Sequence, residues 1–233
     1  MCRDVSASTG LAGGVTPEQA AAVLSELARL HASEWSESTT PRSAGDFARL
    51  RPFVEQHAAA STRYLTEQID ERASARTRRY AEEVAGYFAS LSAGPQTRTH
   101  GDAHPGNVLI PRSPGARPVL IDWQGSAINA PLRDVSRFLT LGLSIEDRQA
   151  HEEDLLHGYL DQLATRNVHY DPATALRDYR TALLLQWGWA VLFFRHEPIW
   201  DRDTRAAMPA LVRRAAAAFD DALAGLDLGV TNS

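Results

Sequence analysis

Apolar residues recur at helical spacing along almost the whole of this chain, and one short stretch breaks that pattern. The break consists of two β-branched runs, residues 108–110 and 119–121, joined by a segment that contains Pro114 and Gly115. Short β-branched runs separated by a Pro-Gly turn favour a hairpin-like pair of strands. Helices, a small β insert and further helices, in that order, predict a mainly helical α+β domain.

Local signals set the expected limits of the domain and its helices. Thr16 is placed to cap a helix, with Pro17 at its first position and Gln19 able to complete a capping box. Residues 1–15 are rich in Gly, Ser and Ala and predict a flexible lead-in to a domain over 16–228. A long helical region is expected after a polar stretch and up to about Leu91. Later helical patterns cover residues 135–143, 151–163, 173–194 and 204–226.

Composition excludes several classes of partner. A chain of 233 residues with 44% hydrophobic content can bury a sizeable core. The net charge of -5 argues against a nucleic-acid-binding surface, and Arg76, Arg78 and Arg79 among acidic neighbours read as a solvated helix face. No stretch has the roughly 18 apolar residues that a membrane span needs. The single cysteine, Cys2, suits a reducing compartment, so a cytoplasmic location is expected.

The residues able to carry chemistry surround the β insert. Residues 100–107 read HGDAHPGN before the first run, and the second run ends in Ile-Asp-Trp-Gln at residues 121–124. A tight hairpin brings the ends of its strands together, so Asp102, Asn107 and Asp122 are expected to converge. Oxygen donors of this kind suit Mg²⁺, and a carboxylate that is not a ligand can accept the proton of a hydroxyl. Phosphoryl transfer needs these parts and little else.

The pattern H-G-D-x-x-x-x-N, an apolar triplet and a later I-D-W resembles the catalytic and metal-binding loops of the aminoglycoside phosphotransferase and choline kinase-like families. The Asp-Trp-Gln ending is most similar to the ecdysteroid-kinase-like branch. The resemblance implies a protein-kinase-like C-terminal lobe whose small β-hairpin carries both loops. It also implies that Asp102 is the catalytic base and that Asn107 and Asp122 bind the metal.

Two more segments fit the same resemblance. Residues 27–32 (LARLHA) are similar to the L-A-x-L-H helix of these kinases, and residues 131–135 (PLRDV) to their P-x-x-D segment. The match runs over about residues 16–200 in the family's order. It implies ATP as co-substrate, Mg²⁺ as cofactor and a small-molecule hydroxyl acceptor as partner.

Several side chains near this motif have two readings. His100 is expected to orient the loop backbone rather than transfer protons, and His104 either contacts substrate or only packs. Asp134 could bind metal, but its place at a helix start favours a bracing hydrogen bond to the loop backbone near His100. His31 is expected to be a buried structural histidine.

The aromatic and acidic residues of the later helices also have two readings. Trp187 and Trp189, with Phe193 and Phe194, could line an acceptor pocket, although their helical spacing is more typical of a core. The acidic residues 152–154 could attract a cationic acceptor, but a solvated helix face is the simpler interpretation.

One departure from the family pattern concerns basic residues. All 24 are arginine, whereas kinases of this type use a lysine in a β-rich N-terminal lobe to pair with the nucleotide phosphates. That lobe is expected to be absent, and no arginine stands in a context that would replace the lysine. A start assigned too far downstream, a truncated gene, or a lobe that needs a separate N-terminal partner would each explain this.

The expected function is transfer of the ATP γ-phosphate to a hydroxyl of a small molecule. The alternative is a non-catalytic binding module or pseudokinase remnant. A Ser/His/Asp hydrolase finds no support, because the chain has no G-x-S-x-G elbow.

Overall fold

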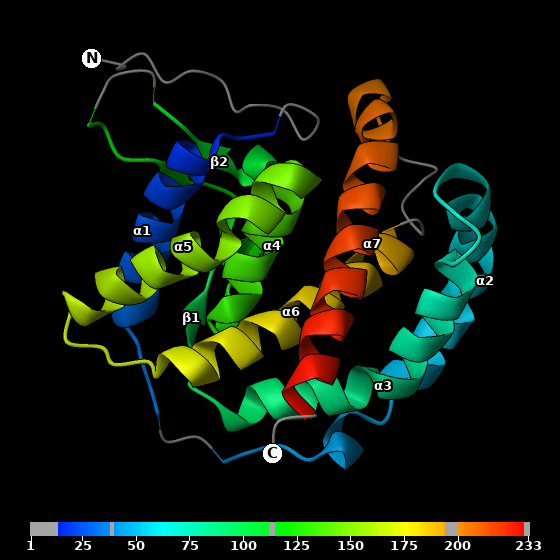
Figure 1. Ribbon diagram of the computed structural model, residues 1–233, viewed down its shortest axis with the longest axis horizontal. Helices are drawn as coiled ribbons and strands as arrows, with labels where there is room; N and C mark the ends of the chain where they lie inside the picture. Colours follow the sequence, from blue (N-terminus) through cyan, green and yellow to red (C-terminus); the bar gives the residue numbers. More distant parts are fainter. Residues whose placement is uncertain (1–13, 38–39, 112–114, 194–199, 231–233) are drawn as a thin grey trace.

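A computed structural model describes residues 14–37, 40–111, 115–193 and 200–230. Its architecture is α+β and mainly helical, as the sequence pattern predicts (Figure 1). The helices are α1 (Pro17–Ala32), α2 (Leu50–Gln68), α3 (Ala73–Ala93), α4 (Leu132–Gly142), α5 (Ile145–Ala164), α6 (Pro172–Phe193) and α7 (Arg202–Val230). The strands are β1 (Thr97–Thr99), β2 (Val108–Leu109), β3 (Val119–Leu120) and β4 (Ala127–Asn129).

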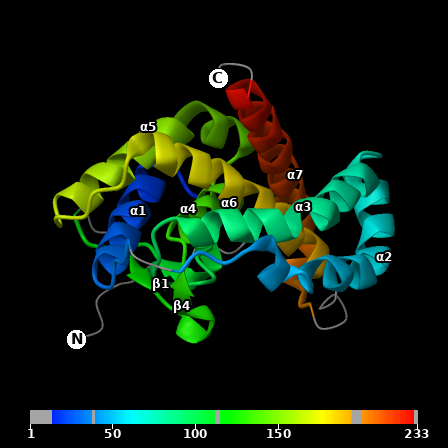
Figure 2. The ribbon, with the colours of Figure 1, turned by 90° about the horizontal axis from the view of Figure 1, so that it is seen from below.

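Helix α6 runs through the centre of the helical arrangement. Figures 1 and 2 show α1 and α5 together on one side of it and α2 on the other. α6 contacts α2, α3, α4 and α7, while α1 packs against α4 and α5. Large, fully buried side chains from these helices form the core, among them Phe138, Tyr159, Trp187 and Phe219. Within the described residues, no helix combines the length and apolar character that crossing a bilayer requires.

The capping box predicted at the start of α1 is present. The Gln19 backbone N–H donates to Thr16 Oγ1 at 3.3 Å, and the Thr16 N–H donates to Gln19 Oε1 at 3.0 Å. Most of the predicted lead-in, residues 1–13, lies outside the described residues. Val15, also assigned to the lead-in, is instead buried and donates its N–H to the Gly142 carbonyl at 2.8 Å.

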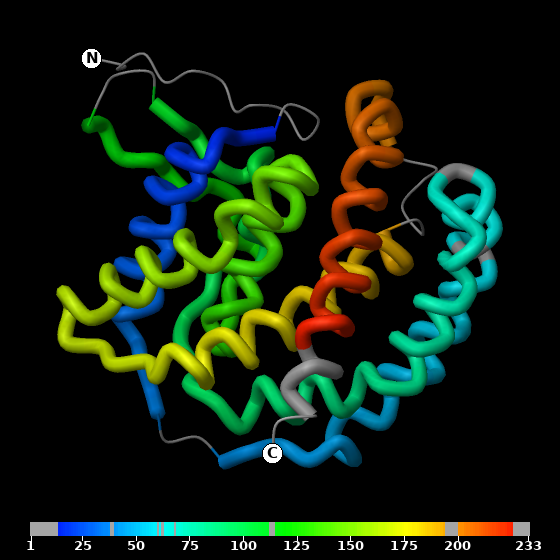
Figure 3. Tube along the Cα trace, in the orientation of Figure 1, coloured from blue at the N-terminus to red at the C-terminus, as the bar shows by residue number. Residues whose placement is uncertain are grey.

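The helical region expected up to about Leu91 consists of α2 and α3, which pack together after a break at residues 69–72. The chain trace in Figure 3 shows the reversal between them. Arg76 does not lie on a solvated face: it is 5% exposed and pairs with Asp70 at 2.8 Å and with Asp220 of α7 at 2.7 Å. Asp220 is far from Arg76 along the chain and approaches it only on folding, so the sequence pattern did not indicate this ion pair.

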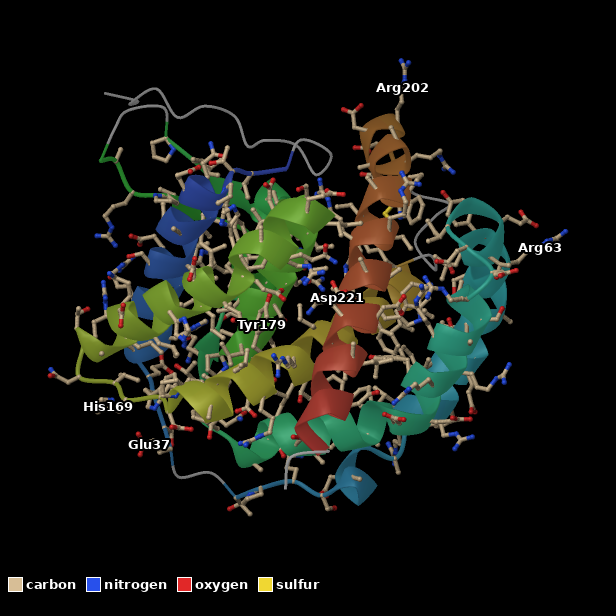
Figure 4. The ribbon with its side chains drawn as sticks, viewed as in Figure 1. Glu37, Arg63, His169, Tyr179, Arg202 and Asp221 are labelled. Carbon is tan, nitrogen blue, oxygen red and sulfur yellow. The ribbon has the colours of Figure 1, made fainter. Side chains whose placement is uncertain are left out.

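A second buried arginine, Arg148, joins α5 to α7 through Asp221 and also pairs with Glu152 one turn along α5. Tyr179 of α6 donates its hydroxyl to Glu152 at 3.0 Å, and Figure 4 labels Tyr179 and Asp221 at the meeting point of these helices. Glu152 therefore belongs to an internal ion network, contrary to its interpretation as part of a solvated face. Because Glu152 is already paired with Arg148, it is not available to attract a cationic acceptor.

Two short antiparallel strand pairs interrupt the helices. The hairpin expected from residues 108–110 and 119–121 is present as β2 and β3, with Val108 opposite Leu120 and Leu109 opposite Val119. The sequence did not indicate the second pair, β1 with β4. Because β1 precedes the HGD segment and β4 follows the I-D-W segment, this pairing holds the two motif segments against each other.

Candidate active site

The loop between β1 and β2 turns sharply at Gly101. The φ angle of Gly101 is +84°, a region that favours glycine. A Cβ built there would lie 1.9 Å from the carbonyl oxygen of Gly125, in the segment that follows Asp122. Glycine therefore allows the two motif segments to approach each other at backbone distance.

Asp134 in the first turn of α4 holds this loop by its backbone. Its Oδ2 accepts the His100 N–H at 2.6 Å, and its Oδ1 accepts the Gly101 N–H at 2.9 Å. Asp134 thus makes two hydrogen bonds to the loop backbone, where one bracing hydrogen bond was expected. Both carboxylate oxygens face the protein interior, since Asp134 is only 1% exposed.

His31 of α1 connects Asp134 to the rest of the helices. Its Nε2 lies 3.2 Å from Asp134 Oδ2, and its Nδ1 lies 2.8 Å from the hydroxyl of Tyr159. An ionised carboxylate can only accept hydrogen bonds, so Nε2 carries a proton and, in the neutral ring, Nδ1 accepts from Tyr159. The histidine is fully buried, as expected of a structural residue.

Burial is the largest single influence on the pKa of Asp134 and raises it. The hydrogen bond from His31 and those from the Gly101 and His100 backbone lower the pKa by more in total, so it lies below its ordinary value. Asp134 is therefore ionised at neutral pH.

Asp102 is held at its side-chain oxygens by two basic side chains. Its Oδ1 accepts from Nε and a terminal nitrogen of Arg137, at 2.9 Å and 2.7 Å, and its Oδ2 lies 3.5 Å from His104 Nε2. Burial, the largest influence, raises the pKa of Asp102, but His104 and the charge of Arg137 lower it well below its usual range. The result is an oriented, ionised carboxylate that remains 36% exposed.

Asn107 and Asp122 lie next to each other through the hairpin. The carbonyl of Asn107 accepts the N–H of Ile121 at 3.0 Å, which places Asn107 beside the residue before Asp122. The Asn107 Nδ2 donates to the Asp102 carbonyl at 3.0 Å, so its Oδ1 is the atom left to bind a cation. Asp122 is exposed and adopts a left-handed backbone with φ of +62°, an uncommon conformation for a non-glycine residue.

This donor set fits Mg²⁺. A carboxamide oxygen and a carboxylate are hard oxygen ligands, and Mg²⁺ often takes few protein ligands and completes its shell with water and phosphate. Across residues 14–37, 40–111, 115–193 and 200–230, no group of three or more His, Cys, Asp or Glu side chains is placed to hold a metal. Asn107 and Asp122 are thus suited to a metal that arrives with phosphate oxygens.

Both ring nitrogens of His100 are used within the loop. Nδ1 accepts the Asp102 N–H at 3.3 Å, so Nε2 carries the proton and donates to the Ile121 carbonyl at 2.8 Å. The ring lies 4.8 Å from that of Trp123. His100 therefore links the Asp102 segment to the Asp122 segment, which matches its expected orienting position.

A cavity of about 750 Å³ opens beside Asp102. Its polar lining includes Asp102, His104 and Arg137, and its apolar lining includes Phe53, Trp189, Leu192 and Phe193. Of the two predicted acceptor contacts from α6, only Trp189 reaches this cavity. Trp187 is fully buried, where it packs near Phe219 and donates to Thr77 at 3.2 Å, so it is a core residue. Phe194 lies outside the described residues.

Sequence reasoning missed Arg137 and Phe53. Arg137 follows Asp134 by three residues, a spacing that places both on one face of α4, so a signal existed. Phe53 comes from α2, far along the chain, and no local pattern connects it with Asp102.

A family model described as "Phosphotransferase enzyme family" matches residues 3–173. The matched region contains Asp102, Asn107, Asp122 and Asp134. The chain belongs to this phosphotransferase family. The resemblance drawn from the HGD and I-D-W motifs is therefore confirmed at the level of this family.

Several solved kinase and phosphotransferase structures share the fold. A choline/ethanolamine kinase family protein from Mesorhizobium loti aligns with a TM-score of 0.56 at 18% identity, over 96% of this chain and 73% of that one. The ethanolamine kinase of Plasmodium vivax gives 0.55 at 10% identity, over 90% and 61%. An aminoglycoside phosphotransferase from Alicyclobacillus acidocaldarius gives 0.52 at 17% identity, over 98% and 70%.

The phosphotransferase chain thus spans between 61% and 73% of the length of these three structures. The kinase-like fold predicted from the motifs is confirmed. A comparison with curated proteins finds no match.

Asp134→Asn in this phosphotransferase should lower the free energy of unfolding by about 3 kcal/mol, because His31 and two backbone donors lose a buried charged acceptor. It should also change the pH dependence. The folded pKa of Asp134 lies below its unfolded value, so its contribution is present above about pH 4 and is lost as the pH falls further. Urea unfolding at a series of pH values measures both effects.

In that range the slope of stability against pH should become shallower by up to about 1.4 kcal/mol per pH unit in Asp134→Asn. Asp154→Asn, the same change at an exposed carboxylate, should leave the slope unaltered. An unchanged slope in Asp134→Asn would contradict the conclusion that Asp134 is ionised in the folded protein.

Proposed function

We propose that this chain carries the catalytic half of an ATP-dependent kinase that phosphorylates a hydroxyl of a small molecule. The observation that supports this most is the arrangement around Asp102: an oriented, ionised carboxylate beside a cavity of about 750 Å³. Asn107 and Asp122 supply oxygen donors at the adjoining strand ends. General base, metal ligands and acceptor cavity are the parts that phosphoryl transfer requires.

In this mechanism Asp102 orients the acceptor. Arg137 makes two hydrogen bonds to Oδ1, whereas Oδ2 has only the longer contacts to Asn107 Nδ2 at 3.4 Å and His104 Nε2 at 3.5 Å. Oδ2 is therefore the oxygen proposed to accept the hydrogen bond of the acceptor hydroxyl. The hydroxyl oxygen bonds to the γ-phosphorus, the bond from that phosphorus to the bridging oxygen of ADP breaks, and the hydroxyl proton passes to Asp102. Because the pKa of Asp102 is low, it is a weak base, and the proton moves as the new bond forms.

Asn107 Oδ1 and the Asp122 carboxylate would hold Mg²⁺. When bound, the ion neutralises charge on the phosphate oxygens. The left-handed backbone at Asp122 turns the chain into the segment that carries Trp123 and Gln124, and Gln124 Nε2 donates to Asp122 Oδ2 at 3.2 Å. This contact fixes one carboxylate oxygen and leaves the other for the metal.

Asp102→Asn should reduce transfer by about a thousandfold, because the amide cannot accept the proton, while MgATP binding stays nearly unchanged. ADP release measures transfer, and calorimetry measures MgATP binding. Asp154→Asn, at an exposed carboxylate, is the matched control and should keep full activity. Loss of nucleotide binding in Asp102→Asn would count against its role as base. MgATP binding without transfer in the unaltered protein would favour the binding-module alternative.

Asp122→Ala should weaken the magnesium-dependent part of ATP binding by at least about tenfold, because the metal loses a carboxylate ligand. The measurement is ATP affinity with Mg²⁺ and with EDTA. The EDTA titration is the internal control and should give the same affinity in both proteins. An unaltered magnesium dependence would refute the assignment.

A further inference from the structure

A second cavity, of about 190 Å³, adjoins the one beside Asp102. The two share Gly101, Arg137, Trp189 and Leu192 in their linings, so a narrow part lies directly beside a wide part. At about 30 Å³ per water molecule, the narrow part has room for a small polar group with a few carbons. α3, α4 and α6 surround it.

Arg133 of α4 lines the narrow part and has no carboxylate partner. Its guanidinium donates to Asn129 Oδ1 and lies 5.1 Å from the ring centre of Phe88. Among the described residues it forms no ion pair, because the neighbouring Asp134 is engaged by His31 and the loop backbone. Among the described residues, the partners of this charged group with five N–H donors are thus the Asn129 amide oxygen and the face of the Phe88 ring.

Arg133 is half-buried, and three other arginines of low exposure have carboxylate partners, whereas the half-buried Arg214 donates to the Leu141 carbonyl instead. Arg76 and Arg148 each pair with two carboxylates, and Arg137 pairs with Asp102. A cation that has lost part of its hydration is stabilised by an anionic partner. Burial is the largest influence on the pKa of Arg133 and lowers it, while the charge of the nearby Asp134 acts in the opposite direction. A small anion would provide that partner with two parallel hydrogen bonds.

Gln186 of α6 also lines the narrow part. Its Nε2 donates to Ser136 Oγ at 3.0 Å and to the Ala182 carbonyl at 3.2 Å, which fixes the orientation of the amide. Its Oε1 is buried and has no hydrogen-bond partner in the described part of the chain. Because this oxygen has almost no accessible surface, Gln186 is part of the cavity wall rather than a contact for a ligand.

We propose that the narrow cavity is a second acceptor subsite in which Arg133 binds a carboxylate. This rests on the proposed function, since the acceptor hydroxyl is the group that faces Asp102. The acceptor class is then a hydroxy acid, with its hydroxyl in the wide part and its carboxylate in the narrow part. Arg137 already pairs with Asp102, the carboxylate that lines the wide part, which makes this carboxylate a poorer partner for a cationic acceptor.

The test uses acetate and its neutral analogue acetamide as probes of the subsite alone. In protein labelled with ¹⁵N-arginine, acetate should shift the Nε–H signal of Arg133 in a saturable manner, and acetamide should not. Arg133→Gln should weaken acetate binding by at least about tenfold, as expected for a lost charge-assisted pair. Arg133→Lys, which keeps the charge but not the planar fork, should retain part of it.

Arg78→Gln is the matched control, because it makes the same chemical change at an exposed arginine and should leave acetate binding unaltered. Absence of an acetate-dependent shift, or equal acetate affinity in Arg133→Gln, would overturn the subsite. Displacement of acetate by MgATP would assign Arg133 to a nucleotide phosphate and overturn the acceptor assignment.

These readouts need no catalysis, so they separate the two proposals. Acetate binding without any phosphoryl transfer would overturn the proposed function and leave the anion site standing. Transfer to a neutral alcohol without acetate binding would overturn the anion site alone.

Discussion

The buried carboxylate of Asp134 is the contact on which the candidate active site depends. It accepts two backbone N–H groups from the turn before Asp102, and the same carboxylate contacts His31, which lies against Tyr159. An ionised group at this depth is stable only because every contact it makes is a donor. The helices therefore position the loop through Asp134 and through the contact of Arg137 with Asp102, and the pairing of β1 with β4 holds the two motif segments against each other.

Sequence patterns revealed those parts of the molecule that local chemistry determines. The capping box at Thr16, the β2–β3 hairpin and the bracing position of Asp134 were all predictable, because each is fixed by spacing within a short segment or by the motif itself. The pairing of β1 with β4 was not, because three-residue strands carry no periodic signal.

Long-range charge pairing was equally hidden. Arg76 and Glu152 looked like surface residues because their partners, Asp220 for Arg76 and Arg148 with Tyr179 for Glu152, meet them in an interior that forms only on folding. Trp187 and Trp189 share one helical pattern, yet two positions along α6 separate a core side chain from a cavity wall. The elements that pack against each position decide which tryptophan is buried, and the local sequence pattern does not contain that information.

The absence of lysine in the sequence has a structural counterpart in how arginine is used. Arg76 and Arg148 connect helices, Arg137 orients the Asp102 carboxylate, and Arg133 forms no ion pair among the described residues and lines the narrow cavity. The planar guanidinium suits all of these positions, because it can donate to two acceptors at once and stays charged when buried.

Amide hydrogen exchange at His100 and Gly101 tests most directly whether Asp134 fixes the loop between β1 and β2. Both N–H groups lie in a loop, where exchange is ordinarily fast, but both donate to Asp134. If Asp134 fixes the catalytic loop, these two amides should exchange as slowly as the core amides of α4. Rapid exchange of both, with α4 still protected, would show that the loop moves independently of the helices and would contradict the account.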